Sequence, residues 1–358
     1  MLNNVNSNGI KILDKYRGLI WKEIKKYLSD PVYPYPFDVP SKFKKEHDFH
    51  WKLVSEYPER QGKYLRPALV FLTCEAMGGN KRKALKTAAA MQTSEDWFLI
   101  HDDLEDKSVE RRGKATLHRM YSSELAVNAG DALQIIMWKI ISDNQGVLGA
   151  QKTVAVTNEF YKILTRTALG QTSEIRWIQK NITDFSDNDW LFISDGKTSY
   201  YTIAGPMRLG AIIAGVNYKQ LEKITEFGLF LGRCFQLVDD ILDVTSDFAG
   251  LKKQTGNDIR EGKRTILLGH LLRNAKRADK KKVIKIMNRA GEKKTEEDVN
   301  WIIKKMHQYG SIEYARSLAK KFKDRAYQIF NEDLTFLSNQ PARKDLETLI
   351  HFVLERNH

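Results

Sequence analysis

The sequence predicts an all-α protein built from long helices, and three features of the chain support this prediction. No proline occurs between Pro67 and Pro206, or between Pro206 and Pro341, so helices in these stretches are not broken by a missing amide donor. Apolar residues recur there at the three- and four-residue spacing of an amphipathic helix. Few windows alternate between apolar and polar residues as a half-buried strand does. The clearest periodic run is Leu221, Ile224, Phe227, Leu231, Phe235, Val238, Ile241 and Leu242.

The first predicted element is an amphipathic helix from about Ile10 to Leu28. Four of the eight prolines then fall between Pro31 and Pro40, where the chain has to be extended or turned. We therefore divide the chain into an N-terminal helix with a proline-rich linker, residues 1–40, and one all-helical domain, residues 41–358.

The rest of the chain is predicted to form long helices separated by short turns. The turns fall at glycine-rich or polar sites, namely Gly78-Gly79-Asn80, Asn144-Gln145-Gly146 and Asn217. The most apolar stretches are short or contain charges such as Arg208 and Arg233, so no segment is expected to cross a bilayer.

The composition allows a sizeable core and indicates an anionic partner. Of the 358 residues 42% are hydrophobic, and the net charge is +13 with a pI near 9.4. This charge suits nucleic acid, an anionic membrane surface or a phosphorylated small molecule, although solvated helix faces also carry lysines. Nucleic acid is not expected, because no basic and aromatic residues alternate as in a binding groove. Weak association with anionic lipid remains open.

The two cysteines and the N-terminus favour a cytoplasmic protein. Cys74 and Cys234 lie in apolar stretches and are predicted to be buried free thiols, which does not suggest a disulfide framework. The first residues are polar and lack the apolar centre of a signal peptide.

Two aspartate clusters carry the chemistry. Asp102 and Asp106 are four residues apart in the first, and Asp239 and Asp243 are four apart in the second. Four helical residues turn through about 400°, so both carboxylates of a pair share one face. Each cluster follows or lies within an apolar stretch, where unpaired charge is costly and a metal or cationic partner is needed. Facing clusters would offer hard oxygen ligands to Mg²⁺, which completes its octahedron with water and phosphate.

Basic residues accompany both clusters. Arg111 and Arg112 follow the first, and arginine forks suit phosphate oxygens because they donate two hydrogen bonds in one plane. Lys63 and Arg66 are about one turn apart if that segment is helical, which would make a second anion site away from the metals. Lys197 has a hydroxyl beside it on Thr198, without the glycine loop of a nucleotide-binding motif. Together these residues predict two phosphorylated ligands, only one of them bound to metal.

At this point the chain resembles the trans-isoprenyl diphosphate synthases, the polyprenyl synthetase family, from about residue 57 to residue 356. The resemblance rests on eight segments in family order: Gly62-Lys-Tyr-Leu-Arg-Pro67, Leu99-Ile-His-Asp-Asp-Leu-Glu-Asp106, Arg111-Arg-Gly113, Asn128-Ala-Gly-Asp131, Gly170-Gln171, Lys197-Thr198, Gly232 to Asp243 with Phe235-Gln236 and Asp239-Asp240, and Gly256 to Thr265. It implies a single-domain helical bundle around a deep central cavity, homodimeric, using three Mg²⁺ ions.

The resemblance also implies roles for individual residues. The metal ligands would be Asp102, Asp106, Asp239 and Asp243. The residues acting in catalysis would be Asp102, Asp103, Asp106, Lys197, Thr198, Gln236, Asp239 and Asp240. The allylic diphosphate would be bound by Arg111, Gln171, Lys197, Lys253 and Lys263. The isopentenyl diphosphate would be bound by Lys63, Arg66, Glu95 and Arg112. The aromatic pair Trp97 and Phe98 would form the floor that limits chain length.

Three positions depart from the family pattern. Glu95 stands seven residues before Asp102, where the family commonly has His or Gln contacting isopentenyl diphosphate. A carboxylate there repels a diphosphate unless a cation intervenes, so the affinity of this site is in question. Glu174 replaces an aspartate and reaches one methylene further, and Ala115 replaces a proline after the arginine pair.

The predicted function is condensation of isopentenyl diphosphate with an allylic diphosphate to a fifteen- or twenty-carbon product. Trp97 and Phe98 favour the shorter product, whereas the segment around Asp102 is similar to geranylgeranyl-type enzymes, and core packing alone is the other interpretation of the two rings. Two other functions stay open: a class I terpene cyclase, which needs neither Lys63 and Arg66 nor the second cluster, and a non-catalytic partner subunit, for which Glu95 is the only indication.

Overall fold

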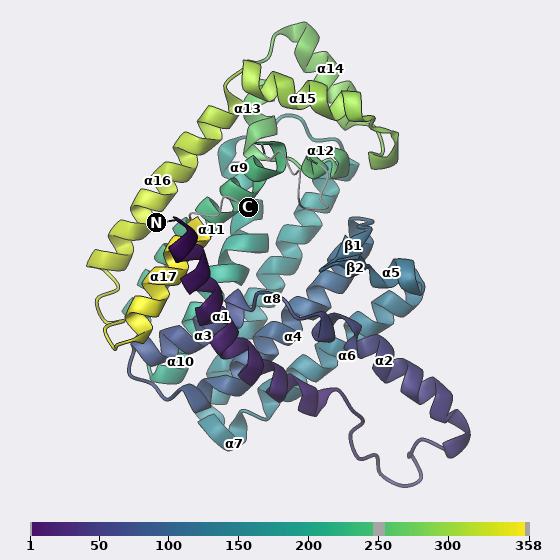
Figure 1. Ribbon diagram of the computed structural model, residues 1–358, viewed down its shortest axis with the longest axis vertical. Coiled ribbons are helices and arrows are strands. Elements are labelled where there is room, and N and C mark those ends of the chain that lie inside the picture. The colour runs from purple at the N-terminus through teal and green to yellow at the C-terminus, as the bar shows by residue number, and fades with distance from the viewer. Residues whose placement is uncertain (1, 246–254, 355–358) are drawn as a thin grey trace.

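The computed structural model describes residues 2–245 and 255–354, and these are almost entirely helical (Figure 1). Lys253 lies outside the described residues. The α-helices are α1 (Leu2–Ile24), α2 (Lys44–Arg60), α3 (Leu65–Ala76), α4 (Lys81–Glu105), α5 (Leu117–Met120), α6 (Ser123–Ser142), α7 (Gln145–Leu148), α8 (Ala150–Gln179), α9 (Asp187–Ser194), α10 (Gly205–Ala214), α11 (Tyr218–Thr245), α12 (Asn257–Glu261), α13 (Ile266–Asn274), α14 (Arg277–Met287), α15 (Glu296–Gln308), α16 (Ser311–Glu332) and α17 (Ala342–Leu354). The all-α prediction is confirmed.

Four further helical segments and one hairpin complete the described chain. Segments η1 (Lys25–Tyr27), η2 (Ser41–Phe43) and η4 (Gly291–Lys293) are 3₁₀ turns. Strands β1 (Glu110–Arg111) and β2 (Lys114–Ala115) pair antiparallel. The segment η3 (Asp195–Ala204) is a π-helix that continues directly from α9 and into α10. The hydrogen bond at its end spans five residues, as in a π-helix, since Gly205 N donates to the carbonyl of Tyr200.

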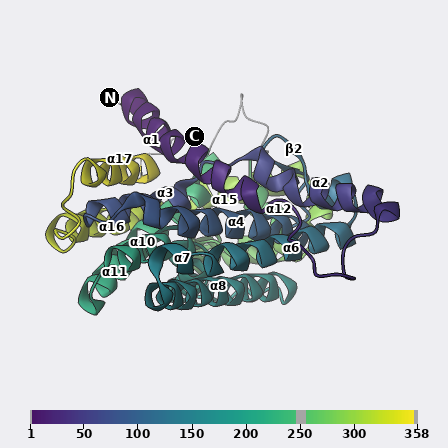
Figure 2. The same cartoon turned by 90° about the horizontal axis from the view of Figure 1, so that it is seen from below.

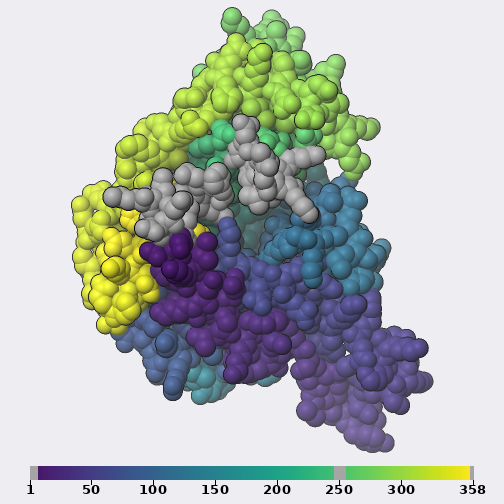
Figure 3. All heavy atoms as spheres, viewed as in Figure 1, coloured from purple at the N-terminus to yellow at the C-terminus, as the bar shows by residue number. Residues whose placement is uncertain are grey.

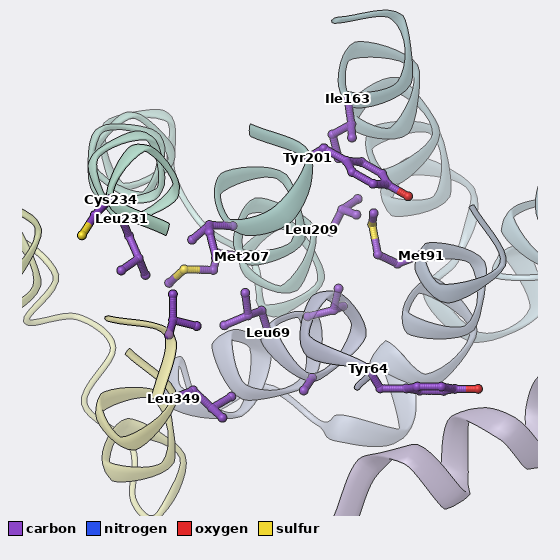
Figure 4. Close-up of a cluster of buried hydrophobic side chains, with 14 of the residues drawn as sticks. Tyr64, Leu69, Met91, Ile163, Tyr201, Met207, Leu209, Leu231, Cys234 and Leu349 are labelled. Carbon is purple, nitrogen blue, oxygen red and sulfur yellow. The ribbon is translucent and has the colours of Figure 1, made fainter. Parts of the chain in front are cut away.

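The helices pack in layers (Figure 2). α1 and α17 lie on one side of α3 and α4, and α8 and α11 lie on the other. The π-helical segment η3 packs between α8 and α11. A close-up of the core shows Tyr201 of η3 directed toward Ile163, Leu209 and Met91, each from a different helix (Figure 4).

The N-terminal helix is longer than predicted and belongs to the core. It begins at Leu2, not near Ile10, and its inward face buries Leu13, Tyr16, Ile20 and Ile24. Contact with α17 overrides the weak helix propensity of the early residues, because Gly9 packs so close to the Phe352 ring that a Cβ there would lie 2.7 Å from it.

The proline-rich segment and α2 project from the body of the molecule (Figures 1 and 3). Val32 is fully exposed, and Tyr35 and Phe37 are 92% and 73% exposed. The three predicted turns coincide with the helix breaks between α3 and α4, between α6 and α7, and between α10 and α11, whereas other breaks, such as those between α8 and α9 and between α16 and α17, were not predicted.

Cys74 and Cys234 are both buried and free, as predicted. Burial raises the pKa of the Cys74 thiol to about 11 and that of Cys234 to about 12. Neither thiol is therefore a ready nucleophile at neutral pH. Among the described residues, no helix is long and apolar enough to span a bilayer.

Candidate active site

The first aspartate cluster ends α4, and its three aspartates have different surroundings. Asp103 is fully buried, whereas Asp102 is partly exposed with Asp106 beside it on the same face. Burial raises the pKa of Asp106 to about 7, with Asp102 and Glu261 adding repulsion that Lys263 only partly offsets. Burial also acts on Asp102, but Lys197, Lys263 and Arg111 outweigh it and lower the pKa of that carboxyl. The pair thus combines one firmly ionised carboxylate with one that needs further positive charge.

Asp103 holds Arg111 in place. The Arg111 guanidinium donates to both oxygens of Asp103 through Nε, at 3.0 Å each, and again through one terminal nitrogen. Tyr57 donates its hydroxyl to the same carboxylate at 2.6 Å. Since all of these groups converge on a fully buried side chain, Asp103 is a support for Arg111.

The β1–β2 hairpin sends two neighbouring arginines to two different places. Arg112 and Gly113 form its two-residue turn with φ of 53° and 78°, the positive values of a type I′ turn. Arg111, on the strand, reaches Asp103. Arg112, in the turn, reaches Asp96 at 2.8 Å and Glu95 at 3.4 Å. The alternating direction of side chains along the strand and the positive φ in the turn therefore direct the two arginines to different partners.

Helix α8 and segment η3 bring a second group of polar residues to Asp102. Lys197 Nζ lies 2.5 Å from Glu174 and 3.4 Å from Asp102, and Gln171 donates to Asp102 at 3.2 Å. This geometry depends on Gly170, because a Cβ at that position would lie 2.7 Å from the Lys197 backbone nitrogen. The glycine lets two helical backbones approach closely, and that approach carries Lys197 to the first cluster.

A hydrogen-bonded chain leads from η3 to the second cluster on α11. Thr198 Oγ1 donates to Gln236 Oε1 at 2.8 Å, and Gln236 Nε2 donates to Asp240 Oδ1 at 2.7 Å. Asp240 is buried and its other oxygen has no hydrogen-bond partner. Burial, with Asp258 and Asp239 adding repulsion, raises the pKa of Asp240 well above its ordinary value.

The other aspartates of α11 differ in exposure and contacts. Asp239 is exposed. Asp243 accepts hydrogen bonds from the first backbone amides of α12, from Asn257 at 3.0 Å and Asp258 at 3.1 Å. The structure therefore gives Asp243 a capping contact in addition to the metal-binding role expected from the sequence.

Lys263 lies between the first cluster and the acidic residues of α12. Its ammonium lies 3.7 Å from Asp106 of α4, 3.6 Å from Asp258 and 2.6 Å from Glu261. Burial lowers the pKa of Lys263, but Asp258, Glu261 and Asp106 raise it far more, so the ammonium stays charged. A pocket at this place is lined by Asp240, Val244, Asp258, Ile259, Lys263, Thr265, Leu268, Met287 and Met306.

The donor set fits a hard divalent cation. Asp106 lies close to Asp102, Asp240 lies close to Asp239 and Asp258, and one buried oxygen of Asp240 is unpaired. Within residues 2–245 and 255–354, no three acidic, histidine or cysteine side chains enclose a metal position by themselves. Magnesium commonly takes one or two carboxylates and keeps waters or phosphate oxygens.

The second predicted anion site contains more negative charge than the sequence interpretation allowed for. Arg66 NH1 lies 3.1 Å from Glu95, which also lies 3.4 Å from Arg112. Asp96, fully buried, accepts from Arg112 at 2.8 Å. Burial raises the pKa of Asp96 to about 6, with Arg112 opposing and Glu95 reinforcing the shift.

Lys63 is not on a helix with Arg66, contrary to the conditional prediction. Helix α3 begins only at Leu65, and Tyr64 before it is left-handed with φ of 60°. Pro67 explains the late start, because proline is tolerated in the first turn of a helix but not deeper. Lys63 is exposed in the preceding loop, next to Gly62, which packs against the Arg112 guanidinium.

The expected floor residues form one aromatic group with a third ring. Trp97 and Phe98 stack with centroids 4.4 Å apart, and Phe98 meets Tyr201 of η3 edge to face at 5.4 Å. Tyr201 shares a hydrogen bond with Ser94 at 3.1 Å and lies under the Arg66 guanidinium at 4.5 Å. The rings lie about one turn of α4 before Asp102, between the two predicted ligand sites.

Sequence reasoning missed several of these residues. Asp258, like the second cluster, has other acidic side chains close to it. The sequence signal that could have identified it is its position between Gly256 and Gly262, which bound the five-residue α12. Tyr57, Asp96 and Tyr201 had no comparable signal, since each acts through a contact made between distant helices.

The fold and these contacts define the class: an all-α protein of the isoprenoid synthase type, with one aspartate cluster on α4, a second on α11, and Lys197 and Lys263 paired with the first. The polyprenyl synthetase family model matches residues 50–306. The geranylgeranyl diphosphate synthase of Saccharolobus solfataricus is 32% identical over 296 residues, covering 82% of this chain and 86% of the relative. The geranylfarnesyl diphosphate synthase of Aeropyrum pernix is 30% identical, covering 82% and 90%. The crystal structure of geranylgeranyl pyrophosphate synthetase from Pyrococcus horikoshii superimposes with a TM-score of 0.82 at 27% identity, over 97% of this chain and 99% of that one. The chain belongs to the polyprenyl synthetase family, as predicted.

Proposed function

We propose that this protein is a Mg²⁺-dependent short-chain prenyltransferase that joins isopentenyl diphosphate to an allylic diphosphate and releases diphosphate. The observation that carries the proposal is that Lys263 lies between Asp106 of the first cluster and Asp258, whose backbone amide donates to Asp243 of the second cluster, with a separate arginine site near Glu95. Relatives named as geranylgeranyl, geranylfarnesyl and short-chain isoprenyl diphosphate synthases support it.

The allylic diphosphate would lie between α4 and α11. Asp102, Asp106, Asp239 and Asp243 would hold up to three Mg²⁺ ions, which supply positive charge to the departing diphosphate. Lys197 and Lys263 remain ammonium ions in this pocket and would add to that stabilisation, as would Arg111 on its Asp103 support. Gln171 would orient Asp102. Lys253 is proposed for the same ligand from the family pattern alone.

Cleavage of the C1–O bond leaves an allylic cation, and this chain offers dipoles to it. The amide of Gln236 is oriented by Thr198 and Asp240. The wider hydrogen-bonding pattern of η3 places backbone carbonyls beside Lys197 and Thr198. The alkene of isopentenyl diphosphate then forms the new carbon–carbon bond, and the proton lost from its C2 passes to the released diphosphate, so no side-chain base is required.

Isopentenyl diphosphate would bind without metal at Lys63, Arg66 and Arg112. The guanidinium groups of Arg66 and Arg112 can each donate two hydrogen bonds in one plane, which suits a second phosphorylated ligand. A class I terpene cyclase has no use for this site, which makes the cyclase the weaker alternative. A non-catalytic partner subunit is disfavoured because both carboxylate clusters are intact.

The product is proposed to contain fifteen or twenty carbons. The aromatic group of Trp97, Phe98 and Tyr201 supplies the physical reason, because three rings about one turn from the proposed metal site leave little room for a longer chain. We further propose a cytoplasmic homodimer, with neither nucleic acid as partner nor a transmembrane segment. Only weak attraction to anionic lipid surfaces would come from the net charge of +13.

Product analysis tests this function. The purified protein is incubated with labelled isopentenyl diphosphate, Mg²⁺ and, in turn, dimethylallyl, geranyl and farnesyl diphosphates. We expect one fifteen- or twenty-carbon product that disappears when EDTA is added. Cyclic hydrocarbon products without consumption of isopentenyl diphosphate would identify a cyclase, and no turnover with any primer would favour the partner subunit.

A further inference from the structure

The site for the second diphosphate contains a carboxylate that faces the ligand's expected position. Glu95 stands seven residues before Asp102 on α4, which is about 20° short of two full turns, so both point from the same helix face about 10 Å apart. Its oxygens lie 3.1 Å from Arg66 and 3.4 Å from Arg112, and these are two of the three cations expected to bind isopentenyl diphosphate.

Neither arginine needs Glu95 to stay in place. Arg66 donates to the Thr202 hydroxyl at 2.9 Å and stacks on the Tyr201 ring at 4.5 Å. Arg112 donates to buried Asp96 at 2.8 Å and to the carbonyl of Tyr57 at 3.3 Å. A residue that only positioned these arginines would therefore be redundant.

Charge is what Glu95 adds to the site. With Glu95 and Asp96 ionised, the two carboxylates balance the charges of Arg66 and Arg112. Asp96 cannot move away, since it is fully buried, whereas the Glu95 side chain is 13% exposed and lies toward the ligand position. A diphosphate arriving at Arg66 and Arg112 has to displace the Glu95 carboxylate from both guanidinium groups or bind against its repulsion.

We propose that Glu95 is a specificity-determining residue that occupies the guanidinium groups of Arg66 and Arg112 in place of the second diphosphate and weakens its binding. The inference rests on the proposed function. It assigns to this chain a low affinity for isopentenyl diphosphate, caused by a built-in competing anion and not by a missing cation. Replacing Glu95 with a neutral side chain is then a gain of affinity, the opposite of what removal of a ligand-binding residue produces.

The test compares Glu95→Gln and Glu95→Asp with the wild type and with Glu56→Gln. Glu56 is a matched control, because its side chain is 15% exposed and it also pairs with an arginine, Arg60 at 3.7 Å. Binding of isopentenyl diphosphate is measured by calorimetry in EDTA, where the metal-dependent site cannot compete. The KM for isopentenyl diphosphate is measured with Mg²⁺ and saturating allylic primer.

We expect Glu95→Gln to bind isopentenyl diphosphate several-fold to about tenfold more tightly, with a parallel fall in its KM and none in the KM of the allylic primer. Glu95→Asp keeps the charge and should stay close to the wild type, as should Glu56→Gln. Where Glu95→Gln does not fold, Glu95→Ala makes the same comparison.

Two results overturn the inference while leaving the proposed function intact. Weaker binding in Glu95→Gln would make Glu95 a helper of the ligand, and unchanged binding would give it no role, provided that the wild type forms product. A wild type that forms no product with any primer would instead defeat the proposed function and the inference with it.

Discussion

At the scale of single residues, the site depends on charges that are paired before any ligand arrives. Arg111 is supported by Asp103 and Tyr57, Lys197 by Glu174 and Asp102, and Arg112 by Asp96. Such pairing fixes long side chains whose ordering would otherwise cost entropy on binding. It also means that each cation reaches a ligand with part of its charge already balanced, which is the physical reason that the proposed function includes metal ions at the first site.

Phe98 gives a prediction on product length. Phe98→Ala removes the ring that bridges Trp97 and Tyr201, which opens space about one turn below Asp102. We expect the product to lengthen by one or more five-carbon units, as measured by chromatography of the dephosphorylated products. Trp97→Ala should act in the same direction, at a cost of about 3–5 kcal/mol in the free energy of unfolding, because that ring is 9% exposed.

The control for this pair is Phe49→Ala, because Phe49 is 41% exposed on the projecting α2, away from these rings. An unchanged product length in both Phe98→Ala and Trp97→Ala would show that the rings are core packing alone.

At the scale of elements, one continuous rod of α9, η3 and α10 organises the pocket. Its π-helical middle contacts α8 through Gly170 and α11 through Gly228 and Gly232, and in each case an added Cβ would meet the backbone of η3. Close backbone approach on two sides places Lys197, Thr198 and Tyr201 at three different parts of the site. Pro206 follows η3 and has no amide to donate, which is compatible with the loosened pattern before it.

Gly170→Ala tests this arrangement. The added methyl group would meet the Lys197 nitrogen at 2.7 Å and push η3 from α8, which moves Lys197 relative to Asp102. A displacement on the order of 1 Å can reduce turnover about 100-fold, so we expect kcat to fall at least tenfold in steady-state assays. The free energy of unfolding should fall by about 1–3 kcal/mol, measured by urea denaturation.

Gly18→Ala is its control, since it is also a helical glycine but has nothing within 4 Å of the added atom. It should keep wild-type kcat and gain stability by up to about 1 kcal/mol. Equal kcat values for the two variants would contradict the proposed function of the α8–η3 contact.

The helices and both aspartate clusters could be predicted because they are local patterns. The periodicity of residues 221–242 and the four-residue spacing of Asp102 and Asp106 need no knowledge of distant contacts. What could not be predicted comes from tertiary packing. The start of α1 depends on Phe352, the left-handed Tyr64 separates Lys63 from α3, and the burial of Asp96 depends on where the hairpin places Arg112.

At the scale of the whole molecule, a basic protein surrounds an acidic pocket. The net charge of +13 favours approach of anionic substrates, while inside the pocket Asp102 repels Asp106, and Asp258 repels Asp240 and Asp243. Because the repulsion acts on the folded state, a ligand set that brings positive charge to the pocket should stabilise the entire fold.

The repulsion inside the pocket predicts how ligands change the thermal stability of the protein. Mg²⁺ with inorganic diphosphate, at about 100 times the dissociation constant, should raise the free energy of unfolding by about 2.7 kcal/mol and the Tm by several degrees. Diphosphate in EDTA should give a smaller rise, since only the arginine site remains. Scanning calorimetry of the wild type measures both rises in Tm. The variants Asp102→Asn and Asp239→Asn should lose the Mg²⁺-dependent part of the rise. An equal rise with and without EDTA would refute metal binding at the clusters.

The proline-rich segment before α2 has a further consequence for handling the protein. It connects α1 to the rest of the chain through residues that are largely exposed, while Tyr16, Ile20 and Ile24 of α1 lie in the core. Proteolysis would therefore begin at this connection, where the backbone is accessible. A single cut there would yield two fragments on a denaturing gel that still migrate together on a sizing column, because α1 is held by packing and not by its covalent link.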